Sequence, residues 1–99
     1  MGLAWFDAKA AKEFGEALAN YFAEKIPVSE KDLNDKQFER KSKRTLTAIS
    51  TQIVEFKKTN SLNLYKRAQL SNKFKWTLID KGYDEKYINE LTMWLVRQL

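Results

Sequence analysis

The chain has 99 residues, of which 43% are apolar and 13% aromatic, and its formal net charge is +5. A chain of this size predicts one domain, residues 1–99, with a core that needs no disulfide or metal. Cysteine and histidine are both absent, which excludes disulfide scaffolds, thiolate nucleophiles, thiolate or imidazole metal ligands and a histidine general base.

The first predicted helix begins near Asp7 and ends before Pro27, because the residue that precedes a proline disfavours helical geometry. Its apolar residues recur at steps of three and four, which predicts one buried stripe: Ala10, Phe14, Ala17, Leu18, Tyr21 and Phe22. Gly15 lies inside this helix, where glycine is less favourable than alanine by about 1 kcal/mol. Either a close helix crossing at Gly15 or simple tolerance of the residue would account for it.

The start of the second predicted helix has two candidate caps. Ser29 with Asp32, or Asn34 with Gln37, would satisfy the first backbone N–H groups, and the sequence does not choose between them. The helix then carries a single narrow apolar stripe, with basic residues on the opposite face. The stripe consists of Phe38, Ser42, Thr45, Leu46, Ile49, Ile53 and Phe56.

A polar run at residues 59–61 interrupts the pattern and predicts a tight helical hairpin, in which Asn60 or Ser61 stops one helix and caps the next. The third predicted helix covers residues 62–81. Its large apolar residues occupy a wide arc, which indicates contact with more than one neighbour. They are Leu64, Tyr65, Ala68, Phe74, Trp76, Leu78 and Ile79.

The end of the third helix is the clearest local signal in the chain. Gly82 suits the left-handed position after a helix, and Asp84 suits the N-cap of the next one. A fourth helix is predicted from Glu85 to near the end of the sequence. Its main face carries Tyr87, Ile88, Leu91, Trp94 and Leu95. Met93 and Val96 point the other way.

These elements predict an all-α fold, a small four-helix bundle in up-down order with short loops. Three long helices with one short helix are the fallback arrangement. No apolar run approaches the roughly 20 residues that a membrane span requires, so we expect a soluble chain that does not cross a bilayer. No secretory signal is visible, and we therefore expect a cytoplasmic location.

Catalytic motifs are missing from the sequence: it has no glycine-rich phosphate loop, no GxSxG elbow, no zinc or EF-hand spacing and no dinucleotide fingerprint. We therefore expect no enzyme activity, no cofactor and no catalytic or metal-binding residue. Lys75 is the one exception to weigh, because it falls inside the apolar arc of the third helix. A desolvated lysine can act as a base or nucleophile, but a lysine whose stem passes apolar neighbours explains the same placement.

Charge is distributed unevenly along the chain. Residues 1–35 contain four basic and seven acidic residues, a net of −3, and residues 36–75 contain eleven and two, a net of +9. Residues 76–99 have a net of −1, from three basic and four acidic residues. The candidate phosphate-binding residues are Arg40, Lys41, Lys43, Arg44, Lys57, Lys58, Lys66 and Arg67. They predict either nucleic-acid backbone contacts or a merely solvated basic face.

Apolar residues outside the main stripes form a candidate protein interface: Trp5, Phe6, Met93, Trp94 and Val96. Large exposed apolar patches usually mark partner surfaces, and tryptophan is a favoured interface anchor. The leading hypothesis is a non-catalytic protein that acts by protein–protein association, as a homodimer through Trp94, Met93 and Val96. The alternatives are an N-terminal segment that folds back over the last helix, and a nucleic-acid-binding protein that uses residues 36–75.

Overall fold

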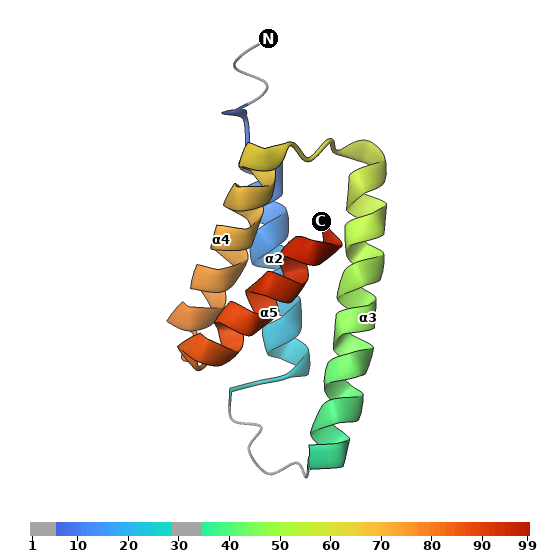
Figure 1. The fold of residues 1–99 in the computed structure, drawn as a ribbon, viewed down its shortest axis with the longest axis vertical. Coiled ribbons are helices and arrows are strands. Elements are labelled where there is room, and N and C mark those ends of the chain that lie inside the picture. The colour runs from blue at the N-terminus through green and yellow to red at the C-terminus, as the bar shows by residue number, and fades with distance from the viewer. Residues whose placement is uncertain (1–5, 29–34) are drawn as a thin grey trace.

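Four helices alternate in direction along the chain in the computed structural model, which describes residues 6–28 and 35–99 (Figure 1). They are α2 (Lys9–Lys25), α3 (Asp35–Thr59), α4 (Leu64–Asp80) and α5 (Glu85–Gln98). Residues 60–63 join α3 to α4, and residues 81–84 join α4 to α5. Within the described residues there is no strand, and the predicted all-α, up-down bundle of four helices is confirmed.

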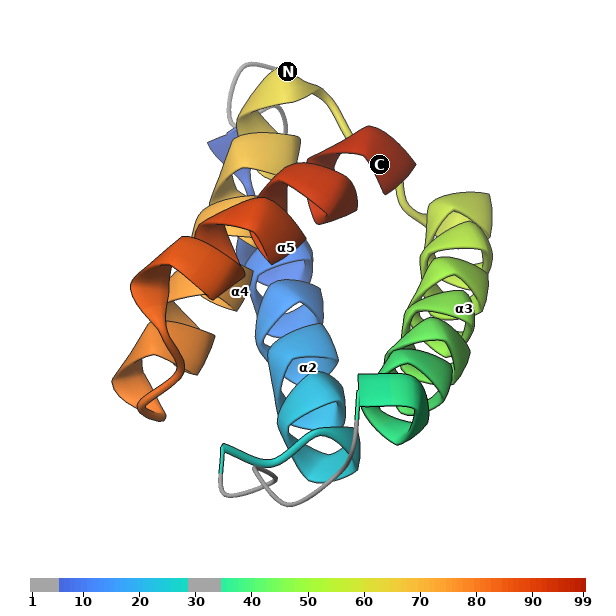
Figure 2. The ribbon, with the colours of Figure 1, turned by 60° about the horizontal axis from the view of Figure 1, so that its bottom comes forward.

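The helices are not equally close to one another. α4 packs along α2 most extensively and also packs against α5, whereas α3 touches α2 at few places. Figure 2 shows α4 and α3 on opposite sides of α2, with α5 crossing obliquely between them. The prediction that the third helix would contact more than one neighbour is therefore confirmed.

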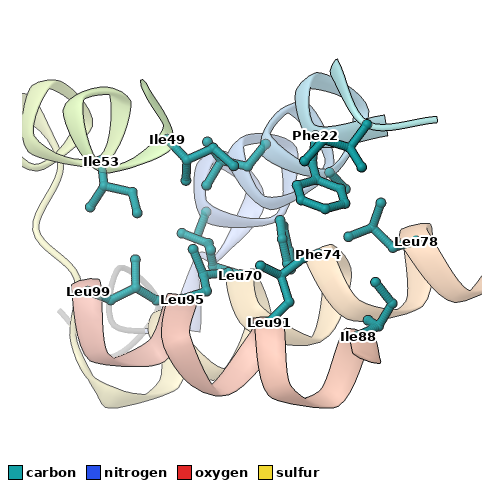
Figure 3. Close-up of a cluster of buried hydrophobic side chains, with 14 of the residues drawn as sticks. Phe22, Ile49, Ile53, Leu70, Phe74, Leu78, Ile88, Leu91, Leu95 and Leu99 are labelled. Atoms are coloured by element: carbon teal, nitrogen blue, oxygen red, sulfur yellow. The ribbon is translucent and has the colours of Figure 1, made fainter. Parts of the chain in front are cut away.

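The core draws large apolar side chains from all four helices (Figure 3). The largest fully buried side chains are Phe22, Phe74, Leu18, Ile49, Ile53, Leu70, Leu78, Ile88 and Leu95. The stripe predicted for α3 is confirmed, because its central residues Ile49 and Ile53 are buried and Phe38, Leu46 and Phe56 pack at the edge of the core.

Gly15 marks a close approach between α2 and α4. A Cβ atom placed on Gly15 would lie 2.4 Å from the carbonyl oxygen of Leu70 in α4, which is far inside van der Waals contact. The close crossing, one of the two explanations for Gly15, is therefore the correct one. Any side chain larger than hydrogen would force the α2 and α4 backbones apart.

The stripe predicted for the first helix is partly wrong. Ala10 and Ala17 are exposed, and small residues four positions apart, Ala11, Gly15 and Ala19, are buried instead. Leu18 and Phe22 are buried as predicted, while Phe14 and Tyr21 are only partly buried. The helix is rotated from its expected orientation because the small side chains let α4 come close, and a close backbone contact excludes the larger ones.

The start and the exposed face of α4 also differ from prediction. Asn63, and not Asn60 or Ser61, is the N-cap, and its Oδ1 accepts a hydrogen bond of 2.8 Å from the Lys66 N–H. Asn60 does stop α3, because its side-chain amide donates to the Phe56 carbonyl at 3.0 Å. The predicted arc was too wide: Leu64, Ala68 and Trp76 are exposed, and the buried face is Leu70, Ser71, Phe74 and Leu78.

The hairpin between α4 and α5 forms as the sequence predicts. Gly82 has φ of 101°, and the Gly82 and Tyr83 N–H groups donate to the carbonyls of Ile79 and Leu78. This is the Schellman arrangement that ends a helix at a left-handed glycine. Asp84 caps α5 by accepting a hydrogen bond of 2.9 Å from the Tyr87 N–H. Both candidate caps for α3, Ser29 and Asn34, lie outside the described residues.

Few contacts attach α3 to the other helices. The Phe56 ring stacks on Phe14 of α2, with centroids 4.1 Å apart and the rings parallel. The Lys57 ammonium donates a hydrogen bond of 2.8 Å to the carbonyl oxygen of Leu99, at the end of α5. Together with buried Thr45, Ile49 and Ile53, these contacts hold the helix against the bundle.

Replacing Gly15 by alanine tests the α2–α4 crossing. In an ordinary helix this change stabilises the protein by about 1 kcal/mol. Here we expect a loss of about 2 kcal/mol, because the new methyl group would collide with the Leu70 backbone. Urea denaturation followed by circular dichroism measures the change, and Asn20→Ala on the exposed side of α2 is the control. A Gly15→Ala protein as stable as the original would contradict the close crossing.

Candidate functional site

Two surface grooves flank α5, one on each side. One of them, the α4–α5 groove, has a volume of about 660 Å³. Its apolar lining comes from Leu64 and Ala68 on α4 and from Met93 and Val96 on α5. The α3–α5 groove lies on the other side and consists of two adjoining hollows of about 370 and 440 Å³ that share Leu46 and Trp94.

The α4–α5 groove carries most of the exposed apolar surface of these two helices. Leu64 is 80% exposed, Met93 61% and Val96 51%. The groove exists because α4 and α5 pack through Leu70, Phe74, Ile88, Leu91 and Leu95, which leaves the opposite edges of both helices uncovered. Three large apolar side chains around one groove form a patch, in contrast to single apolar residues scattered over a surface, which are normal.

The charged side chains of the α4–α5 groove all have one sign. Arg67 and Lys75 line it, and no carboxylate is among the described residues that do so. The Arg67 Nε donates a hydrogen bond of 3.1 Å to the Leu62 carbonyl, and the Lys75 ammonium lies 5.0 Å from the centre of the Trp76 ring. Both cations are therefore held in place at the groove by contacts within the chain, while neither has an ion-pair partner among the described residues.

Thr92 lines the same groove, and its hydroxyl group is buried. Its Oγ1 is buried and has no hydrogen-bond partner among the described residues, although a helical threonine commonly donates to the carbonyl four positions earlier. Thr77 on α4 makes that bond, donating to the Lys73 carbonyl at 2.6 Å. A buried hydroxyl without a partner is destabilising, so the Thr92 side chain lowers the stability of the hairpin that carries the groove.

The α3–α5 groove is lined by aromatic and acidic side chains, together with Lys43. Phe38 and Leu46 come from α3, and Tyr87 and Trp94 come from α5, with Glu39 and Glu90 beside them. Burial raises the pKa of the Tyr87 phenol, because desolvation disfavours the charged form. Tyr87 is thus neutral across the ordinary pH range and serves as part of the wall.

The residues predicted as a protein interface are not all together. Met93 and Val96 share the α4–α5 groove, while Trp94 is partly buried and lines the α3–α5 groove. Phe6 is exposed and meets the Tyr65 ring edge-on, with centroids 5.3 Å apart. Trp5 lies outside the described residues. Sequence reasoning missed Leu64, because the periodic pattern of α4 placed it in the core.

The predicted basic residues are also divided into two groups. Arg40, Lys41, Lys43 and Arg44 lie in the first half of α3, and Lys57 and Lys58 lie at its end. With a rise of about 1.5 Å per residue, Lys41 and Lys57 are about 24 Å apart along the helix axis. Lys66 and Arg67 lie in the first turn of α4. The eight residues do not form one continuous patch.

The second basic group consists of Lys57, Lys58, Lys66 and Arg67, and three of these residues make contacts within the chain. Lys57 bonds the Leu99 carbonyl, Lys58 pairs with Glu55 at 2.8 Å, and Arg67 bonds the Leu62 carbonyl. In the first group, Arg40, Lys43 and Arg44 are exposed, and no ion pair involves them within the described ranges. Three exposed cations close together on one helix make the first group the better candidate for phosphate contacts.

Lys75 is partly buried, and its ammonium lies over the Trp76 ring. The acidic residues nearest in sequence along α4 and α5 do not line the groove, so no carboxylate there could exchange a proton with it. Among the described residues, no group of three or more aspartate or glutamate side chains could hold a metal ion. The placement fits a lysine whose apolar stem covers part of the groove.

Comparison with protein-family models, with curated proteins and with solved structures gave no match for this chain. In the parts of the chain that the structure describes, every helix is too short or too polar to cross a bilayer.

Replacing Thr92 by valine tests the unpaired hydroxyl. Valine has nearly the same shape, so the change removes the buried polar group and leaves the packing. We expect a gain of about 1 kcal/mol in the free energy of unfolding, measured by urea denaturation. The matched control is Thr77→Val, which removes a hydroxyl that has a partner and should give no gain. A loss of stability in Thr92→Val would mean that the hydroxyl is hydrogen-bonded in solution.

Proposed function

We propose that this protein acts by protein–protein association, without catalysis, and that the α4–α5 groove is its contact surface. The supporting observation is the grouping of Leu64, Met93 and Val96 around one groove, each more than half exposed. A partner that covered them would remove a large apolar patch from water, which is the main favourable term in most protein association.

The size of the patch is adequate for this role. Burying one leucine, methionine or valine side chain is favourable by roughly 1.5–3 kcal/mol, and a micromolar complex requires about 8 kcal/mol in total. The three groove residues could thus supply a substantial part of the binding free energy. The remainder would come from the surrounding polar and charged groups, which also determine the choice of partner.

The structure reduces the set of residues that one homodimer interface could include. Trp94 lines a different groove from Met93 and Val96, so one partner surface that covered the α4–α5 groove would not also cover Trp94. The proposal therefore assigns the contact to Met93, Val96 and Leu64.

Charged substitutions in the groove test this proposal. We expect Met93→Glu and Val96→Asp to weaken association by about tenfold or more each, because each puts a charge into a surface that must lose water. Sedimentation velocity on the purified chain measures self-association, and quantitative capture with each variant as bait measures binding to other proteins.

The matched control is Val54→Asp, which changes a valine that is 57% exposed on α3, outside both grooves. It should behave as the original chain does. The proposed function is wrong if Met93→Glu and Val96→Asp show the same oligomeric state and capture the same proteins as the original chain and Val54→Asp.

A second candidate function is binding of a nucleic-acid backbone by the first basic group. The observation in its favour is that Arg40, Lys43 and Arg44 are exposed on α3 and free of ion pairs within the described residues. Cations of this kind contact phosphates with little sequence preference, and their affinity falls steeply as the salt concentration rises, since bound counterions are released.

Reversing Arg40, Lys43 and Arg44 to glutamate tests the second function. We expect any affinity for duplex or single-stranded DNA and RNA at low salt to fall by at least about tenfold. The control reverses Lys9, Lys12 and Lys81, which are exposed elsewhere and change the net charge equally. Equal losses in the two triple variants would show a nonspecific charge effect, and undetectable binding by the original chain would exclude this function.

A further inference from the structure

The α4–α5 groove has the length and form of a helix-binding site. α4 and α5 run in opposite directions along its two sides (Figure 1). From Leu64 to Lys75, the α4 side extends about 17 Å, which equals about three turns of an α-helix. Met93 and Val96, three positions apart, face the groove from α5. Grooves of this kind accept the apolar face of an amphipathic helix, whose anchors recur at steps of three and four.

The charges at the groove distinguish between two occupants. A second copy of the chain that docked through the same surface would bring the same Arg67 and Lys75 against this pair, because a two-fold interface joins identical patches. Like charges would then meet while they lost water, and the groove offers no carboxylate to offset them. A partner that carried carboxylates would pair with both cations.

We infer that the α4–α5 groove binds an acidic amphipathic helix of another protein, with apolar residues on Leu64, Met93 and Val96 and carboxylates beside Arg67 and Lys75. This inference rests on the proposed function and specifies its partner. Each cation also makes one contact within the chain, Arg67 to the Leu62 carbonyl and Lys75 to the Trp76 ring, and neither contact involves a carboxylate.

Two designed peptides provide a direct probe. Both have about fifteen residues and carry leucine at positions i, i+4, i+7 and i+11, and the flanking positions are glutamate in one peptide and lysine in the other. Fluorescence anisotropy of the labelled peptides is measured against the full chain at two salt concentrations. We expect the glutamate peptide to bind about tenfold more tightly than the lysine peptide, with a preference that shrinks at high salt.

Charge reversal of the groove should exchange the preference. In Arg67→Glu with Lys75→Glu, we expect the lysine peptide to bind more tightly than the glutamate peptide. The control reverses Lys9 and Lys12, which are exposed on α2 and outside the groove, and changes the net charge by the same amount. It should keep the original preference. Circular dichroism checks that each variant folds. If the Arg67→Glu, Lys75→Glu double variant does not fold, the Arg67→Gln, Lys75→Gln double variant replaces it, and we expect it to bind both peptides equally.

Each remaining outcome decides the inference. Equal binding of both peptides that Met93→Glu abolishes would overturn the acidic partner and leave the proposed function intact. If the original chain forms a dimer that Met93→Glu disrupts, a second copy is the occupant of the groove. This result would also overturn the acidic partner and leave the proposed function intact. If neither peptide binds, the inference is wrong, and if Met93→Glu and Val96→Asp also leave every association unchanged, the proposed function is wrong as well.

Discussion

The backbone contact between Gly15 and Leu70 sets the arrangement of this bundle. Because α2 and α4 approach so closely there, their small and apolar faces form the centre of the core, and α5 packs on the side of α4 that remains. α3 is left on the far side of α2 (Figure 2). The two grooves beside α5 follow from this order, since α5 covers neither the outer edge of α4 nor the inner side of α3.

Much of the fold could be predicted from the sequence, because its signals are local. Ile49 and Ile53 repeat at the helical period, and Gly82 with Asp84 encodes a helix end and a helix start within three residues. The orientation of α2 could not be predicted, because alanine and glycine contribute little to an apolar pattern. Their burial depends on a partner backbone that is distant in sequence.

The candidate site was predictable in part for the same reason. Met93 and Val96 were expected to face away from the main stripe of α5, and they do. Leu64 was assigned to the core, because nothing in the pattern of α4 tells its first turn from its buried centre. Arg67 was grouped with distant lysines by its charge, whereas the fold places it beside Met93 and Val96 in one groove. Proximity of that kind requires the packing of α4 against α5.

The sparse attachment of α3 has a consequence for motion. Phe56 stacks on Phe14 and Lys57 bonds the Leu99 carbonyl, but α3 touches α2 at far fewer places than α4 does. Regions with few buried contacts open with a smaller free energy than the centre of the core. Amide hydrogens of α3 should therefore exchange with solvent through local opening, while those of α2 and α4 around Gly15 and Leu70 exchange only when the whole domain unfolds.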